Sequence, residues 1–140
     1  MSNKPSILLV EDEENLHEAL KLNLELEGYQ VTSAFDGIEA MKAVQNEYFD
    51  LIILDVMMPI MDGLEVCREV KKISPTIPVI LLTARDDMVT RAAAMDLGVS
   101  EFIAKPVNNA DLLNRVRTQL SNVAWDKAAD QAVAKMDKAE

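Results

Sequence analysis

The sequence predicts an α/β protein with a doubly wound, five-stranded parallel sheet, that is, a sheet covered by helices on both faces. Short apolar runs alternate five times with stretches whose apolar residues recur at helical spacing, which is the pattern of βαβ units. Parallel strands buried on both faces have continuous apolar sequences, and residues 51–54 are such a run. A length of 140 residues suits one domain.

The first half of the chain predicts two strand–helix units. Residues 7–10 form a short apolar run, and residues 13–27 follow with apolar positions at helical spacing until Gly28 ends the pattern. Residues 30–34 include β-branched side chains, which favour a strand. An Asp-Gly pair at 36–37 then turns the chain into the second predicted helix.

The second half repeats the alternation three times. Its predicted strands are residues 51–55, 78–82 and 102–104. Its predicted helices cover residues 64–73 and 86–97, and the last one begins near Asn108 or Asn109, both of which are good N-caps.

All of these elements fall within residues 1–121, which we expect to form the domain. The apolar stripe of the last helix slips in phase near Ser121 and resumes at Trp125. We therefore expect residues 122–140 to form a helical or frayed tail, with an amphipathic contact helix as the alternative. The tail is too short for a second domain.

Charge and composition exclude several classes of function. The net charge is −10, whereas direct nucleic-acid binding needs a positive surface, so this chain alone is not expected to bind nucleic acid. No apolar run approaches the roughly 20 residues of a membrane helix, and no signal-peptide pattern is present. The single cysteine, Cys67, cannot form an internal disulfide and is expected in the core. These features indicate a cytoplasmic protein.

Polar side chains stand at the carboxyl ends of four predicted strands. They are Glu11 and Asp12 after the first strand, Asp55 at the end of the third, Thr83 after the fourth and Lys105 after the fifth. Each has an ordinary explanation when taken alone, such as a favourable helix dipole or a solvated surface charge. Ligands of open parallel sheets, however, bind outside the carboxyl ends of the strands.

Clustered carboxylates at such an edge would require a cation. Two carboxylates about 4 Å apart repel by roughly 4 kcal/mol at an effective dielectric near 20, a large cost for a marginally stable domain. A few carboxylates completed by water suit Mg²⁺ better than a fully caged Ca²⁺. A carboxylate beside Mg²⁺ and a lysine is equipped for phosphoryl transfer, with the carboxylate as nucleophile.

Four motifs, "LLVEDE", "LIILDVMMPIMDG", "LLTA" and "FIAKP", occur in this order and spacing. Together they resemble the receiver domain of two-component response regulators of the chemotaxis-regulator-like kind, over roughly residues 5–121. The resemblance implies a flavodoxin-like (βα)5 fold with strand order 2-1-3-4-5. It also implies that Asp55 is the phosphoacceptor and that Mg²⁺ is the cofactor.

The same resemblance assigns roles to the other site residues. The Mg²⁺ ligands would be the side chains of Asp12 and Asp55, the backbone carbonyl of Met57, and Glu11 through a bound water. Lys105 and Thr83 would bind the phosphoryl group, and the peptide bond before Pro106 is expected to be cis.

Further residues would govern signalling. Thr83 and Phe102 would form the switch, and Phe102 stands where the family often has Tyr, so a switch that uses a phenol hydrogen bond is excluded. Met57 and Arg85 flank the approach of the hydrolytic water in such domains. Met57 cannot usefully hydrogen-bond that water and occupies volume along its approach, and Arg85 has only donors and cannot take its proton. We therefore expect a persistent phosphoryl group; the alternative is that both side chains point to solvent and have no effect.

The implied function is to accept a phosphoryl group from a histidine kinase or a phosphotransfer protein. Phosphorylation would switch a surface made by the fourth helix, fifth strand and fifth helix, which would bind a downstream protein or a second copy. Such a domain catalyses only its own phosphorylation and dephosphorylation. Whether it acts alone or as part of a longer regulator is left open by the sequence.

Two other functions agree less well with the sequence. A haloacid-dehalogenase-type hydrolase would have Asp-x-Asp on the first strand, but Asp55 lies on the third strand and is followed two positions later by Met57. A flavodoxin-like cofactor module would need a phosphate-binding loop after the first strand, where "EDEEN" would repel phosphate. His17 is expected on the helix surface, far from the site, and packing is expected to explain the methionines near Asp55.

Overall fold

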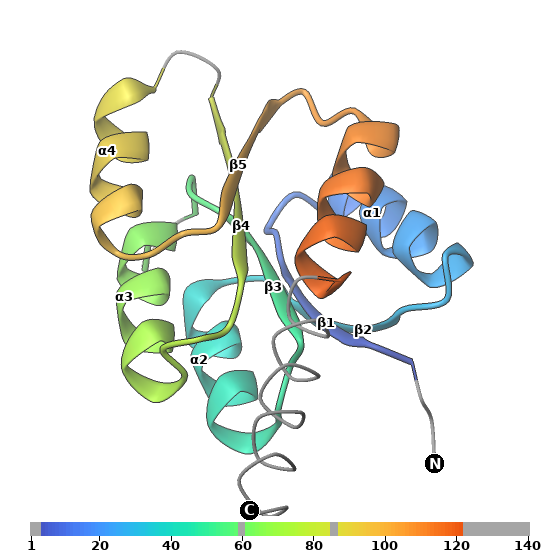
Figure 1. The fold of residues 1–140 in the computed structure, drawn as a ribbon, viewed down its shortest axis with the longest axis horizontal. Helices are drawn as coiled ribbons and strands as arrows, with labels where there is room; N and C mark the ends of the chain where they lie inside the picture. Colours follow the sequence, from blue (N-terminus) through green and yellow to red (C-terminus); the bar gives the residue numbers. More distant parts are fainter. Residues whose placement is uncertain (1–3, 59–60, 85–86, 122–140) are drawn as a thin grey trace, which may run out of the picture.

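Five parallel strands form one sheet in the order β2-β1-β3-β4-β5 (Figure 1). The computed structural model describes residues 4–58, 61–84 and 87–121. The strands are β1 (Ser6–Val10), β2 (Gln30–Ala34), β3 (Leu51–Asp55), β4 (Val79–Ala84) and β5 (Glu101–Lys105). The predicted doubly wound fold and its strand order are confirmed.

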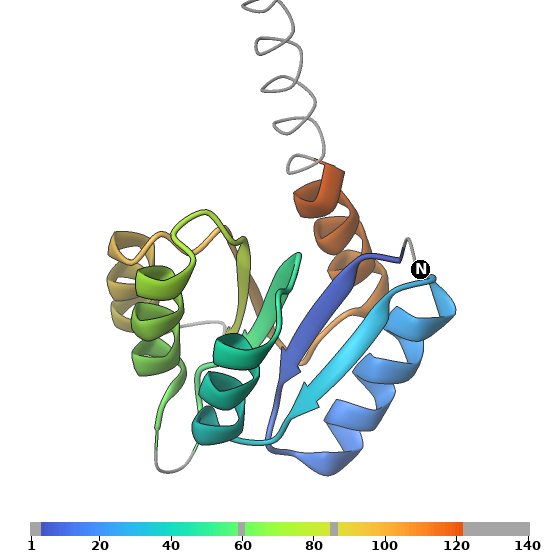
Figure 2. The same ribbon diagram turned by 90° about the horizontal axis from the view of Figure 1, so that it is seen from below.

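Helices cover both faces of this sheet. They are α1 (Glu14–Leu26), α2 (Gly37–Asn46), α3 (Gly63–Ile73), α4 (Met88–Asp96) and a helix over residues 109–121. Figure 2 shows α1 and the 109–121 helix on one side of the sheet, and α2, α3 and α4 on the other. Each layer buries its own apolar cluster against the sheet.

The central strand, β3, explains why Asp55 is held rigidly. All five of its residues are buried. Ile52 and Leu54 belong to the cluster under α2, α3 and α4, while Leu51 and Ile53 belong to the opposite cluster. A strand packed on both faces cannot shift without opening the core, so the aspartate at its end has a fixed position.

The last two strands are longer than predicted. Pairing continues at Thr83 with Ala104 and at Ala84 with Lys105. The apolar runs predicted that these strands end at Leu82 and Ala104. A hydrophobic pattern cannot show that backbone pairing between strands continues through polar residues. Thr83 and Lys105 therefore lie within strands rather than in the loops that follow.

A close approach at Gly63 joins α3 to the end of β3. A Cβ at this position would lie 2.6 Å from the carbonyl oxygen of Asp55 and 2.7 Å from the Cα of Val56. The Gly63 N–H donates to the Val56 carbonyl at 3.1 Å, and Asp62 caps α3 by accepting from the Glu65 N–H. Only glycine fits this contact, which holds the start of α3 against the end of β3.

Some predictions fall outside the described residues. The tail at residues 122–140 is one of them, and Arg85 is another. Within residues 4–58, 61–84 and 87–121, no helix combines the length and apolarity that a membrane span requires. Cys67 is buried in the core, as predicted.

Candidate functional site

Three carboxylates meet at the carboxyl edge of the sheet. β1 pairs with β3 so that Val10 lies beside Leu54, and the residues that follow, Glu11 and Asp55, reach the edge together. One side-chain oxygen from each of Glu11, Asp12 and Asp55 lies within 4.8 Å of the others, the one such grouping found in the described part of the chain. Glu11 and Asp55 are buried, whereas Asp12 is exposed.

Lys105 reaches this cluster from β5. Its Nζ lies 2.9 Å from Asp55 Oδ2 and 3.3 Å from Glu11 Oε1. The remaining oxygens of these two carboxylates accept backbone hydrogen bonds, Asp55 Oδ1 from the Met57 N–H at 3.1 Å and Glu11 Oε2 from the Glu13 N–H at 3.0 Å. The lysine therefore attracts both buried carboxylates, and the backbone N–H groups orient them.

The cluster carries an excess of negative charge. With all three carboxylates ionised, the cluster and the Lys105 ammonium together carry two negative charges, which is the charge that one divalent cation balances. Burial, together with the charge and hydrogen bond of Asp55, raises the pKa of Glu11 to about 7, although its backbone hydrogen bond from Glu13 lowers it. Burial lowers the pKa of Lys105, but Asp55 and Glu11 outweigh it and raise that pKa.

Two buried polar atoms at this edge lack a hydrogen-bond partner among the residues that the structure describes. Glu11 Oε1 lies within ion-pair distance of Lys105 but makes no hydrogen bond of acceptable geometry, and Thr83 Oγ1 is also unpaired. An unsatisfied buried polar atom costs about 1–3 kcal/mol. A hard cation that prefers oxygen ligands fits the carboxylates, and a ligand with acceptor oxygens fits the hydroxyl.

Thr83 and Phe102 share one face of the sheet. Leu81 pairs with Phe102 and Thr83 pairs with Ala104, and side chains two positions apart on a strand point to the same face. Phe102 packs partly buried against the core cluster under α4. The Arg91 guanidinium of α4 lies 5.7 Å from the centre of its ring, so this aromatic ring contacts the helix beside it.

The remaining predicted site residues have different surroundings. Met57 is 71% exposed, so packing does not explain it, and that interpretation was wrong; Met58, at 8% exposed, is a core residue. The bond between Lys105 and Pro106 is cis, the isomer that the resemblance implies.

His17 contradicts its predicted surface location. Its side chain is 1% exposed. Nδ1 lies 2.8 Å from the Glu11 carbonyl oxygen and Nε2 lies 2.7 Å from Ser33 Oγ. The prediction was wrong because His17 lies on the same helical stripe as the buried Leu20 and Leu24, three and seven residues later. The residue is therefore joined to the acidic edge of the sheet.

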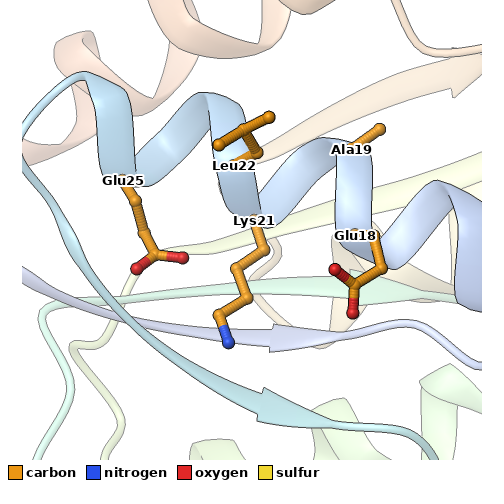
Figure 3. Close-up of a pocket in the computed structure, with 5 residues that line it drawn as sticks. All are labelled: Glu18, Ala19, Lys21, Leu22 and Glu25. Atoms are coloured by element: carbon orange, nitrogen blue, oxygen red, sulfur yellow. The ribbon is translucent and has the colours of Figure 1, made fainter.

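A shallow hollow on α1 lies apart from the acidic cluster. Glu18, Ala19, Lys21, Leu22 and Glu25 line it. Figure 3 shows Glu18, Lys21 and Glu25 pointing to one side of the helix. None of these residues belongs to the carboxylate group, so this hollow adds nothing to the site.

Comparisons with known proteins identify the family of this chain. A family model described as the response regulator receiver domain matches residues 7–117. Response regulator MprA from Mycobacterium sp. (strain KMS) is 40% identical over 124 residues, which cover 89% of this chain and 54% of the relative. The chain thus spans about half the length of the curated relatives it matches.

Solved structures give the same result. A CheY-like receiver domain protein from Methanospirillum hungatei JF-1 superposes with a TM-score of 0.85 at 29% identity, over 89% of this chain and 99% of that one. The receiver domain of sensor histidine kinase PA1611 from Pseudomonas aeruginosa PAO1, with a magnesium ion coordinated in its active site cleft, has a TM-score of 0.77 at 29% identity, over 84% and 98% of the two chains. The chain belongs to the response regulator receiver domain family.

Proposed function

We propose that this domain accepts a phosphoryl group on Asp55 from the phosphohistidine of a histidine kinase or a phosphotransfer protein, in a reaction that requires Mg²⁺. The observation that supports this most strongly is the buried Asp55 carboxylate, held beside Lys105 in a cluster of three carboxyl groups that has, among the described residues, only this one ammonium against them. The nucleophile is fixed in place, and its surroundings call for a cation.

The proposed metal ligands are the carboxylates of Asp12 and Asp55 and the backbone carbonyl of Met57, with Glu11 acting through a bound water. When bound, Mg²⁺ supplies positive charge to the oxygens of the transferring phosphoryl group. The oxygen-rich donor set, its negative charge and the unpaired Glu11 Oε1 all suit such an ion.

The residues of the chain have separate tasks in the transfer. A carboxylate oxygen of Asp55 forms the new P–O bond as the P–N bond to the donor imidazole breaks, and the electron pair of that bond leaves with the imidazole. Lys105, which holds Asp55 at 2.9 Å, then pairs with a phosphoryl oxygen. The unpaired Thr83 hydroxyl donates a hydrogen bond to another.

Movement of Thr83 couples the site to a surface. When this hydroxyl turns towards the phosphoryl group, it leaves room that the half-buried Phe102 ring can enter by changing rotamer. Phe102 touches Arg91 of α4, so its rotation alters the face made by α4, β5 and the 109–121 helix. Met88, Val89 and Met95 are exposed on α4, and we propose that this face binds a downstream protein or a second copy.

Replacing Thr83 should separate phosphorylation from output. Thr83→Ala should still take up phosphate, because Asp55 and the acidic cluster are unchanged, but should lose the phosphorylation-dependent complex. Uptake and complex formation are measured in parallel by intact mass and by size-exclusion chromatography. Thr83→Ser, which keeps the hydroxyl, is the matched control and should retain the complex. A complex of parental strength in the alanine variant would remove Thr83 from the mechanism.

The lifetime of the phosphoryl group should depend on positions 57 and 85. Hydrolysis needs a water in line with phosphorus, and polar side chains that orient this water by hydrogen bonds or accept its proton speed the step. The exposed Met57 side chain cannot do this. Met57→Asn combined with Arg85→Glu should therefore raise the decay rate severalfold with Mg²⁺ present, measured by following the loss of the phosphorylated form. An unchanged or slower decay contradicts this assignment.

The proposed domain covers residues 1–121, with residues 122–140 as a tail. Because kinase phosphoryl groups come from ATP, we place the reaction in the cytoplasm. The chain is proposed to act through protein contacts and to catalyse only its own phosphorylation and dephosphorylation. Specific DNA binding would need a further basic domain, since the net charge here is −10.

A phosphotransfer assay tests this function. Each candidate histidine kinase is first autophosphorylated, and the purified protein is then added with Mg²⁺. One kinase should lose its label to this protein much faster than the others do. If neither a kinase nor a small acyl phosphate labels the protein, the proposed function is wrong.

A further inference from the structure

The imidazole of His17 connects three elements beside the acidic cluster. It comes from the first turns of α1, contacts the Glu11 carbonyl at the end of β1 and contacts Ser33 of β2. The ring of Phe35 stacks on it, with the ring centres 4.2 Å apart and the planes at 21°. Both ring nitrogens thus have a partner, and one ring face is covered.

The partners determine which nitrogen carries the proton. A carbonyl oxygen can only accept a hydrogen bond, so the proton must be on Nδ1, which donates to Glu11. The Ser33 hydroxyl can then donate to Nε2. This arrangement satisfies both contacts without charge on the ring.

The carbonyl that His17 holds belongs to the peptide unit between Glu11 and Asp12. The orientation of that unit sets the backbone direction at Asp12, and hence where its carboxylate points. Asp12 has no hydrogen bond or ion pair of its own within the described residues, and its side chain is exposed. The N-cap residue of α1, Glu13, makes no side-chain cap hydrogen bond, so the His17 ring is an additional tie between the helix and the strand end.

The other hydrogen bonds that Glu11 makes within the described residues leave its carbonyl oxygen to His17. Its N–H donates to the Ala34 carbonyl at 3.1 Å, and its carboxylate accepts from Glu13. Neither bond is made to the Glu11 carbonyl oxygen, which belongs to the peptide unit before Asp12. In the metal-free protein, repulsion among the carboxylates would tend to turn Asp12 away, and the imidazole opposes this by holding the peptide plane.

We propose that His17 is a positioning residue for the metal site: its Nδ1–H fixes the peptide plane between Glu11 and Asp12 and so prepares the acidic cluster for Mg²⁺. This inference rests on the proposed function and adds a residue to it. Groups that orient ligands in this indirect way typically change metal affinity by 10–100-fold when removed.

A series of variants separates this role from simple packing. His17→Phe keeps the stacked ring but loses both hydrogen bonds, while His17→Asn keeps a donor close to the position of Nδ1. Ser33→Ala is the matched control, because it removes the Nε2 contact and leaves the Glu11 bond. Mg²⁺ affinity is read from amide chemical shifts in an NMR titration, and stability from thermal melting.

The expected results differ between affinity and stability. His17→Phe should bind Mg²⁺ about tenfold more weakly, whereas His17→Asn and Ser33→Ala should stay within about threefold of the parent even if all three melt at lower temperature. Parental affinity in His17→Phe, or an equal loss in His17→Asn or Ser33→Ala, would overturn the inference. If the parent itself binds no Mg²⁺, the proposed function fails and the inference fails with it.

A measurement on the unaltered protein covers the case in which His17→Phe does not fold. Long-range ¹H–¹⁵N correlation identifies which ring nitrogen of His17 is protonated. Because the chain has a single histidine, the signal needs no assignment by mutation. The inference requires a proton on Nδ1, and a ring whose Nδ1 carries none would overturn it.

Discussion

Asp55→Asn should fold like the parent and take up no phosphoryl group from a small acyl phosphate. The amide has the shape of the carboxylate but is a very poor nucleophile, so the step that forms the P–O bond is lost altogether. The variant also removes one of the two ion-pair partners of Lys105, leaving Glu11 as the other. We therefore expect a complete loss of phosphorylation with only a modest change in melting temperature.

Intact-protein mass spectrometry after incubation with acyl phosphate and Mg²⁺ measures this uptake. Asp36→Asn is a suitable control, because Asp36 does not belong to the carboxylate cluster, its side chain caps α2, and Asn caps a helix equally well. The control should be phosphorylated like the parent. Uptake by Asp55→Asn at the parental rate would show that another residue is the acceptor.

Asp12→Ala should abolish Mg²⁺ binding while raising the stability of the metal-free protein. The alanine lacks the carboxylate that is exposed and best placed for a metal. Loss of this carboxylate also removes its repulsion with Glu11 and Asp55. Because Asp12 faces solvent, this repulsion is screened, and we expect the free energy of unfolding to rise by up to about 1 kcal/mol. Thermal melting in the presence of a chelator measures it.

The stabilisation should depend on pH. The pKa of Glu11 is raised to about 7, so below that pH Glu11 keeps its proton in the folded protein and repels Asp12 less. The gain from Asp12→Ala should therefore be larger at pH 8 than at pH 6. A metal-free variant that melts well below the parent at pH 8 would contradict this account of charge crowding.

Most of the fold followed from local patterns in the sequence. Apolar runs, helical spacing and the Asp-Gly pairs located every element that the structure describes. The strand order came from the family resemblance, since periodicity carries no information on which strands are neighbours. The predicted ends of β4 and β5 fall before the observed ends, because Thr83 and Lys105 are polar residues that pair within strands.

The part of the site that could be predicted from the sequence is the set of polar residues at the carboxyl ends of the strands. Lys105, Asp55 and Glu11 were expected together and lie within ion-pair distance. The sequence pattern does not place His17 at the site, because a lone histidine on a helix is expected at the surface. Its spacing from Leu20 and Leu24, both buried, was the available signal. Its contact with a backbone carbonyl has no counterpart in any sequence motif.

The central claim is that Asp55 is phosphorylated in a Mg²⁺-dependent reaction, and mapping the phosphoryl group tests it most directly. The protein is incubated with a small acyl phosphate as donor, in the presence of either Mg²⁺ or a chelator. The protein is then treated with borohydride, which converts a phosphorylated aspartate to homoserine. Peptide sequencing should find homoserine at position 55 only, and only in the sample with Mg²⁺. Homoserine at Asp12 or another aspartate, a reduced glutamate such as Glu11, or equal modification in the chelator would contradict the account.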